Sequence, residues 1–513
     1  MRLLSIRVSL PFAAVLFACS AAAQSAAPLT LEQVMADPDW IGAPVEDAWW
    51  AWDGQRVQYQ RKRDGATIRD TFQQSIDGGV PTMIDGAARA DLDASNPVFD
   101  ARHARMAFAR NGDIFVRQLQ NGVLRSGALT QVTRSNDDDT LPQWSSDGGL
   151  AWRVGNDWYR WTAQGGVVQA ALVKAEKAPG VAPKSDDLRE RQLRLIDTLR
   201  NDKAKRDAAR AQEDAWRAAD PTRAPTPAYL GDDVTIADSA LSPDGRWLLV
   251  VTTAKGADAG QAGKLPKYVT ESGYEEFEEA RVRVGRNAPL PQRLWLVDAA
   301  AGKVRELKYD TLPGIKDDPL AALRKAAGKD ALNGNRAVRI ETDGDGTGPA
   351  IHWSDDSRNV AVLVRAVDNK DRWIATVDTA NATLQTRDHL HDNAWINWNF
   401  NDFGWMPDGK RLWFLSEQSG WSQLYMSDGG KPRQLTSGKW EASSPQLSAD
   451  GKTFYFVCNR ARPGDYEVCA VAADGGVVRD VTAMDGVEGF VLSPDGSKLL
   501  VRHSSSYLPP QLA

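Results

Sequence analysis

The sequence predicts an all-β fold: an eight-bladed β-propeller with an incomplete last blade and a charged helical insertion. Three observations point to this fold. One turn motif recurs eight times, a second turn between two strands follows most copies, and most copies stand 42 to 52 residues apart. Four short antiparallel strands in a repeat of about 40 to 50 residues are typical of a propeller blade.

The recurring motif is an apolar residue or Trp, then Ser-x-Asp-Gly or a close variant, then a polar residue and an apolar strand. In such a turn the Asp accepts backbone hydrogen bonds and the Gly adopts a positive φ, so each copy predicts the turn between two strands. The anchoring aspartates are Asp53, Asp100, Asp147, Asp244, Asp356, Asp408, Asp450 and Asp495. The two doubled gaps, 97 and 112 residues, contain no further anchor and predict insertions.

A second pattern supplies the later strands of each blade. A strand ends near an Asp, a Gly-containing turn follows, and a short strand closes on Leu-Thr or Val-Thr, as in residues 424–436 and 467–482. Together with the anchor motif, this pattern predicts about four antiparallel strands per repeat.

The first insertion, about 185–220, is highly charged and predicts a helical segment. Leu188, Leu193, Ile196 and Leu199 recur at near-helical spacing. Ser185 or Asp186 could cap the start of this helix, and Pro221 would end it. Two interpretations stay open: a solvated helix that leans on the propeller, or a contact surface for another domain or protomer.

The second insertion, about 255–291, carries an acidic cluster followed by basic residues. The acids are Glu275, Glu276, Glu278 and Glu279, and the bases are Arg281, Arg283 and Arg286. One interpretation is a solvated loop with internal salt bridges. The other is an acidic cluster that grips the amino terminus of a peptide.

Residues 1–23 have the pattern of a secretory signal peptide. Arg2 and Arg7 form a basic start, residues 8–18 are apolar, and residues 21–23 form an A-x-A-like cleavage site. The expected mature chain, 24–513, is therefore periplasmic or secreted. A competing interpretation is a lipoprotein signal that leaves Cys19 lipidated, which would be the route to a membrane.

After cleavage the chain keeps two cysteines, Cys458 and Cys469. They stand symmetrically about Pro463-Gly464, so two strands that turn there would place them opposite each other. Since the expected compartment is oxidising, a disulfide between them is one prediction. Two buried free thiols are the alternative.

Charge and composition exclude several classes of protein. The formal net charge of −6, from 68 acidic and 62 basic residues, gives no global basic field that would attract nucleic acid or anionic lipid. The 19 Trp and the hydrophobic fraction of 42% argue against a disordered chain. We therefore expect a large aromatic core and no nucleic-acid partner. The sequence has no Walker-type or dinucleotide-binding glycine loop, so we expect no cofactor.

No self-sufficient catalytic motif appears in the sequence. There is no G-x-S-x-G, and the nearest string, residues 420–424 around Ser422, lacks the second glycine of a nucleophile elbow. The chain has five His and no H-E-x-x-H. The pair His389-x-His391 would share one side of a strand, and we interpret both as surface residues. We assign no catalytic residue, and the substrate-binding residues remain unknown.

Two acidic strings were weighed as metal sites. Asp343-Gly344-Asp345-Gly346-Thr347 resembles the start of a calcium loop, but the twelfth position is Ser354, not an acid. Residues 137–139 are three consecutive aspartates, interpreted as a solvated loop between blades. No metal site is predicted.

Residues 416–459 carry the strongest resemblance to a known family. Gly420-Trp421, Leu424-Tyr425, Leu435-Thr436 and Trp440-Glu441 occur in the family's order. With the entry segment LTLEQVMADPDW and the eight motif copies, the mature chain resembles the N-terminal propeller of bacterial dipeptidyl peptidase IV-like serine peptidases, in the prolyl oligopeptidase family.

The resemblance implies a propeller that caps a C-terminal α/β-hydrolase domain and restricts entry to short peptides. In this family the hydrolase domain holds the catalytic triad. The family's glutamate pair occurs in a D-W-x-x-E-E segment, of which residues 213–216 are a distant echo, so we assign that role to no residue.

Eighteen residues follow Asp495, fewer than a blade needs, so we expect a truncated propeller whose ring stops before it closes. The predicted function is the substrate-gating portion of a secreted serine exopeptidase or oligopeptidase that is catalytically incomplete as this chain. The expected partners are the missing hydrolase domain, short peptides and a second copy in a homodimer. The alternatives are a natural stand-alone chain and a non-catalytic periplasmic binding propeller of the TolB type.

Overall fold

The computed structural model describes residues 29–36, 42–119, 127–179, 185–220, 222–256, 260–282, 287, 289–341, 348–484 and 486–513. The predicted signal peptide, Cys19 and the 343–347 string lie outside the described residues. The chain divides into two compact units, Met1–Ala43 and Pro44–Ala513. In the first, helix α1 (Leu31–Met35) begins at a capping box between Thr30 and Gln33, as the entry segment predicts.

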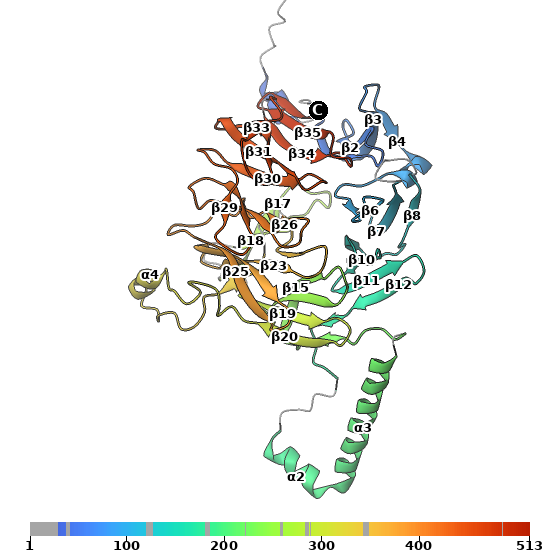
Figure 1. Cartoon of the computed structure of the whole chain (residues 1–513), viewed down its shortest axis with the longest axis vertical. Helices are drawn as coiled ribbons and strands as arrows, with labels where there is room; N and C mark the ends of the chain where they lie inside the picture. The colour runs from blue at the N-terminus through green and yellow to red at the C-terminus, as the bar shows by residue number, and fades with distance from the viewer. Residues whose placement is uncertain are drawn as a thin grey trace, which may run out of the picture. The chain divides into compact units, whose positions relative to one another are not determined.

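The described part of the second unit forms eight antiparallel sheets arranged in a ring, which confirms the eight-bladed propeller (Figure 1). Blade 1 consists of β1 (Val45–Trp50), β2 (Arg56–Lys62), β3 (Arg69–Ser75) and β4 (Thr82–Ile84), and blade 2 of β5 (Val98–Phe99), β6 (Arg105–Arg110), β7 (Asp113–Gln118) and β8 (Leu129–Gln131). Blade 3 consists of β9 (Asp139–Trp144), β10 (Leu150–Val154), β11 (Asp157–Thr162) and β12 (Gly166–Ala171). Blade 4 consists of β15 (Val234–Leu241), β16 (Trp247–Ala254), β19 (Gln292–Asp298) and β20 (Lys303–Leu307).

The remaining blades come from the C-terminal half of the ring. Blade 5 consists of β22 (Ile351–Trp353), β23 (Val360–Ala366), β24 (Asp371–Asp378) and β25 (Thr383–His391), with β21 (Val338–Arg339) also paired to β23. Blade 6 consists of β26 (Phe403–Trp405), β27 (Leu412–Ser416), β28 (Gln423–Ser427) and β29 (Arg433–Gln434). Blade 7 consists of β30 (Ala442–Leu447), β31 (Thr453–Arg462), β32 (Asp465–Ala472) and β33 (Arg479–Asp480), and blade 8 of β34 (Val487–Leu492), β35 (Leu499–Ser505) and β36 (Leu508–Leu512). Blade 8 has three strands among the described residues, in agreement with the predicted incomplete last blade.

Every anchor aspartate lies in the turn between the first and second strands of its blade. In blade 4, Asp244 Oδ1 accepts the backbone N–H of Arg246 at 3.0 Å, and Gly245 has a φ of 73°. In blade 8, Asp495 Oδ1 accepts the N–H of Ser497 at 3.0 Å in the same way. The sequence motif therefore marks a local turn, which the anchor Asp stabilises by accepting a backbone hydrogen bond from two residues further along the chain.

Tryptophans on first strands join neighbouring blades. The indole N–H of Trp144 donates to Val98 O at 3.0 Å, and that of Trp405 donates to His352 O at 2.9 Å. Trp50 of blade 1 donates in the same way to Val491 O of blade 8, at 3.0 Å.

A second contact also joins blades 1 and 8, because Arg502 donates to Glu46 O at 2.8 Å. The expectation of a ring that stops before closing is therefore wrong. The joining hydrogen bonds come from the first two strands of blade 8, and its third strand, β36, also contacts β1.

We expect Trp50→Phe to lower the free energy of unfolding by about 1 kcal/mol, since the variant keeps the ring packing and loses one hydrogen bond. The midpoint of urea unfolding measures this change. The exposed Trp216→Phe is the matched control and should leave the midpoint unchanged. Equal midpoints for Trp50→Phe and the wild type would contradict a role for the indole in joining blades 1 and 8.

The first insertion lies between two short paired strands, β13 (Val173–Lys174) and β14 (Ala228–Tyr229). It forms two helices, α2 (Asp187–Leu195) and α3 (Asp197–Ala219), separated at Ile196. Asp186 caps α2 by accepting the N–H of Arg189 at 2.7 Å, as predicted. No described side chain of either helix is buried, so neither helix leans on the blades.

The second insertion connects the second and third strands of blade 4. It forms a β-hairpin of β17 (Ala262–Lys267) and β18 (Glu276–Val282), where the sequence suggested a loop. A third excursion, residues 308–337, contains the short helix α4 (Ala321–Ala326) and was not predicted.

The cysteines are joined in a disulfide within blade 7, with their Cα atoms 5.9 Å apart. The strands are paired antiparallel, but Cys458 lies opposite Glu467 and Cys469 opposite Phe456. The bridge therefore runs diagonally across the β31–β32 pair and not straight across it, because the hairpin has an irregular register near its turn.

Candidate functional site

A cavity of about 340 Å³ lies where the 308–337 excursion meets the end of blade 5. The turn between β23 and β24 and the end of β25 lie at the edge of the blade opposite its anchor turn, as an antiparallel meander requires. The cavity therefore lies on the ring face opposite the Asp-Gly turns. Its walls are Asp317, Asp318, Pro319, Arg336, Asp371, His389, His391 and Asn393.

Asp371, the first residue of β24, is the centre of the polar network here and is 2% exposed. His391 lies directly opposite it in the ladder with β25. Asp371 Oδ1 contacts His391 Nδ1 at 2.9 Å and His389 Nε2 at 2.7 Å. The two imidazoles share one face of β25 because they are two residues apart, so both reach the same carboxylate oxygen.

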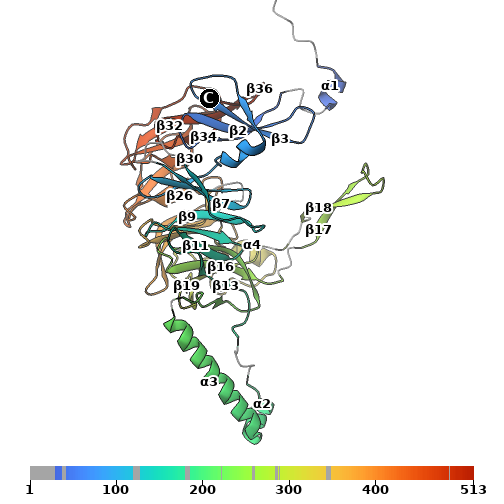
Figure 2. The same ribbon diagram turned by 90° about the vertical axis from the view of Figure 1, so that its right-hand side faces the viewer.

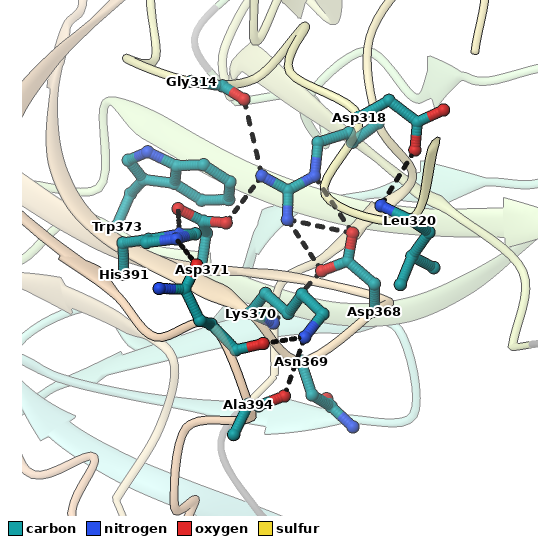
Figure 3. A network of polar contacts seen from close by, with 12 residues as sticks. Gly314, Asp318, Leu320, Asp368, Asn369, Lys370, Asp371, Trp373, His391 and Ala394 are labelled. Carbon is teal, nitrogen blue, oxygen red and sulfur yellow. Dashed lines mark hydrogen bonds and ion pairs between the residues drawn. The ribbon is translucent and has the colours of Figure 1, made fainter. Parts of the chain in front are cut away.

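Arg336 binds the other oxygen of this carboxylate, with Asp371 Oδ2 2.6 Å from its guanidinium. The same guanidinium donates to Asp368 at 2.7 and 2.9 Å (Figure 3). The Arg336 side chain is 4% exposed. Two acids therefore surround one buried cation, and the two histidines complete the cluster.

Trp373 links this cluster to the 308–337 excursion. His389 stacks on its ring at 5.4 Å between centroids, and the Arg336 guanidinium lies 5.8 Å from it. The indole N–H donates to Pro313 O at 2.9 Å. The network thus fastens the base of the excursion to blade 5.

The electrostatics follow from burial and pairing. Burial raises the pKa of Asp371, but the hydrogen bond from His389 and the contacts with Arg336 and His391 outweigh it, and the pKa is lowered. Burial lowers the pKa of His391, yet its hydrogen bonds with Asp371 and Asn393 prevail and raise it. The arrangement keeps Asp371 ionised and favours a charged His391.

The cluster does not have the geometry of a metal site. Both imidazoles point at one carboxylate oxygen, and a cation there would meet the guanidinium of Arg336. Among the described residues, the group whose ligand atoms lie within 4.8 Å of one another is Cys458, Cys469 and Asp480, in which the two sulfurs are joined in the disulfide. We assign the network around Asp371 a structural role.

Other residues weighed in the sequence are also structural. Ser422 is fully buried and donates to Ala442 O at 2.7 Å, which agrees with its exclusion as a nucleophile. Asp139 is 4% exposed and accepts the indole N–H of Trp152 at 2.8 Å, so interpreting 137–139 as wholly solvated was wrong. Glu213 is exposed on α3 and pairs with Arg223 at 2.5 Å.

Sequence reasoning missed Asp371 and Arg336. They lie 18 and 53 positions before His389, and the strand pairing and the chain excursion bring them together. The signal available in the sequence was the His-x-His spacing, which does place two rings on one face.

None of the helices in the described part of the chain is both long and apolar enough to cross a membrane.

Comparison with known proteins finds a family model that matches part of the ring and solved structures with a similar fold. Residues 332–510 match the family model described as the dipeptidyl peptidase IV (DPP IV) N-terminal region. The fold is similar to the crystal structure of Porphyromonas gingivalis dipeptidyl peptidase 4, with 13% identity and a TM-score of 0.52 over 95% of this chain and 60% of that one. A putative dipeptidyl aminopeptidase IV from Bacteroides ovatus is 12% identical, with a TM-score of 0.49 over 92% of this chain and 58% of that one.

These findings confirm the resemblance to the N-terminal propeller region of dipeptidyl peptidase IV. The match covers blades 5 to 8, and the eight-bladed arrangement extends over the second unit. The chain spans 60% of the length of the Porphyromonas protein.

Proposed function

We propose that this chain is the substrate-gating propeller of an exported serine exopeptidase or oligopeptidase that acts on short peptides. The observation that carries the proposal is the match of residues 332–510 to the DPP IV N-terminal region, within a ring of eight blades. The signal-peptide pattern of residues 1–23 supports export.

In this proposal the chemistry belongs to an α/β-hydrolase domain that works with the ring. The sequence has no G-x-S-x-G. Ser422, which lies in the string most similar to that motif, is buried in the propeller and donates its hydroxyl to Ala442 O. A ring of blades in front of a hydrolase would admit peptides by size and exclude folded proteins. The propeller then contributes access and selection, and the hydrolase cleaves the bond.

The encoding DNA gives the first test. An in-frame G-x-S-x-G segment a hundred or more codons downstream of codon 513 is expected. The purified chain of residues 24–513 should not cleave a proline-containing chromogenic dipeptide, and the continuous product should. Cleavage by residues 24–513 alone would refute the catalytic division of labour. Absence of the downstream segment would favour a binding propeller that carries no hydrolase.

A further inference from the structure

Three neighbouring strands of blade 7 bring two sulfurs and a carboxylate together. Cys458 lies on β31, Cys469 on β32 and Asp480 on β33; Figure 1 labels β31 and β33, and Figure 2 labels β32. Asp480 lies directly opposite Cys469 in the β32–β33 ladder. On its other side Cys469 lies opposite Phe456, which comes two residues before Cys458. Residues opposite each other share a face of a sheet, as do residues two apart on one strand, so all three side chains lie on the same face.

The three groups are close enough to share one ligand. One ligand atom of each lies within 4.8 Å of the other two, and Cys469 Sγ lies 3.5 Å from Asp480 Oδ1. Cys458 is 1% exposed and Cys469 0%, whereas the Asp480 side chain is 53% exposed. The cluster therefore has a buried sulfur end and a carboxylate end that solvent reaches.

The redox state of the sulfurs decides what this cluster binds. In the oxidised chain they form the disulfide, and the thiolate is the form of cysteine that binds metals. A dithiol reductant transfers two electrons and two protons to the bridge, becomes a disulfide itself and leaves Cys458 and Cys469 as thiols. Burial disfavours the thiolate unless a positive charge accompanies it, and a bound metal ion supplies that charge.

The spacing of the groups suits a tetrahedral cation. With Zn–S bonds of about 2.3 Å and a Zn–O bond of about 2.1 Å, ligand atoms at tetrahedral angles are about 3.6 to 3.8 Å apart. The distance from Cys469 Sγ to Asp480 Oδ1 is already 3.5 Å. Reduced sulfurs must also move apart beyond bonding distance, which is the direction that a metal between them requires. The exposed carboxylate end leaves the fourth position to water.

Arg460 is the group that competes with a cation here. Its Nε lies 3.3 Å from Asp480 Oδ1, and its side chain is 34% exposed. The same guanidinium donates to Val478 O at 2.7 Å, so it keeps a partner when it leaves the carboxylate. An ion pair that solvent reaches on both sides contributes about 1 kcal/mol or less, which a metal bound by two thiolates exceeds.

We propose that Cys458, Cys469 and Asp480 of the reduced chain bind a thiophilic divalent cation, for which Zn²⁺ is the best fit. Binding releases the two thiol protons, forms two metal–sulfur bonds and one metal–oxygen bond, and breaks the contact between Asp480 and Arg460. The metal then links β31, β32 and β33, so it replaces the covalent link that reduction removes. The proposal concerns blade 7 alone and does not depend on the peptidase assignment.

Titration with Co²⁺ tests the site, because thiolate ligands give this ion a charge-transfer absorption that Zn²⁺ abolishes by displacing it. In the full chain with Cys19→Ser, Cys458 and Cys469 are the remaining cysteines. Reduced with a phosphine and freed of metal, it should bind a single Co²⁺ with this absorption, and the oxidised chain should show none. Cys458→Ser and Cys469→Ser should each weaken the affinity at least about a hundredfold. A reduced chain without the absorption would overturn the proposal, and so would equal absorption in the oxidised chain.

Variants of the charged residues test the carboxylate separately. Asp480→Asn should weaken the affinity for Co²⁺ at least about tenfold, because it removes a charged ligand. Asp474→Asn, in the same blade and 82% exposed, is the matched control and should leave the affinity unchanged. Arg460→Gln should strengthen binding about threefold, because the competing guanidinium is gone, and damage to the fold does not produce a gain of affinity. Equal affinities in the wild type, Asp480→Asn and Arg460→Gln would overturn the three-ligand site.

Discussion

Arg336→Met is expected to lower the free energy of unfolding by about 3 to 5 kcal/mol, the cost of removing one partner from a buried ion pair. The guanidinium is 4% exposed and binds both Asp368 and Asp371. Methionine fills much of the same volume but leaves the Asp371 carboxylate, 2% exposed, without its cation. The loss should also loosen the 308–337 excursion, because Arg336 and Trp373 fasten its base to blade 5.

Urea unfolding at pH 8 measures the change. Arg358→Met is the matched control: this arginine is 79% exposed, lies 3.7 Å from Asp356, and its loss should cost less than about 0.5 kcal/mol. At pH 5.5 the penalty for Arg336→Met should shrink, since His391, whose pKa is raised by its hydrogen bond with Asp371, then supplies the cation that Asp371 has lost. A loss below about 1 kcal/mol at pH 8 would show that the network does not hold the excursion.

The arrangement of blades could be predicted because its signal is local. An anchor such as Asp244 forms its hydrogen bond to Arg246, two residues away, and Gly245 supplies the positive φ. Such a turn requires the same residues in every blade, so the number and spacing of the motif copies predict the number of blades. Ring closure was misjudged because Trp50 and Val491, which join blades 1 and 8, lie 441 residues apart.

The candidate site left little trace in the sequence. His389 and His391 share a strand face, but Asp371 comes from the neighbouring strand and Arg336 from beyond a helical excursion. Their meeting depends on register and on the path of residues 308–337. Nothing in composition or periodicity encodes either, because both depend on contacts between residues that lie far apart in the sequence. The hairpin β17–β18 was not predicted either, because its cluster of acidic and basic residues was interpreted as a loop.

Acidification is expected to destabilise the protein through His352. This imidazole packs edge-on against Phe403, with 4.5 Å between ring centroids, at the junction of blades 5 and 6. Burial lowers the pKa of His352 to about 4, against a hydrogen bond with Pro349 that raises it. The folded pKa lies below the unfolded value of about 6.5, so the unfolded chain binds the proton first. Stability is therefore full above pH 6.5 and falls as the pH drops toward 4.

At about 1.4 kcal/mol per pH unit, the loss between pH 6.5 and pH 5 is about 2 kcal/mol. His352→Gln cannot titrate, so its unfolding midpoint should vary less with pH in this window. His391 acts with the opposite sign: its raised pKa adds stability at low pH that is lost as the pH rises through the folded value. In His391→Gln the free energy of unfolding should therefore fall more steeply with decreasing pH than in the wild type, whereas in His352→Gln it should fall less steeply. Identical pH profiles for the wild type and His352→Gln between pH 7 and pH 5 would show that the pKa of this imidazole is the same in the folded and unfolded chain.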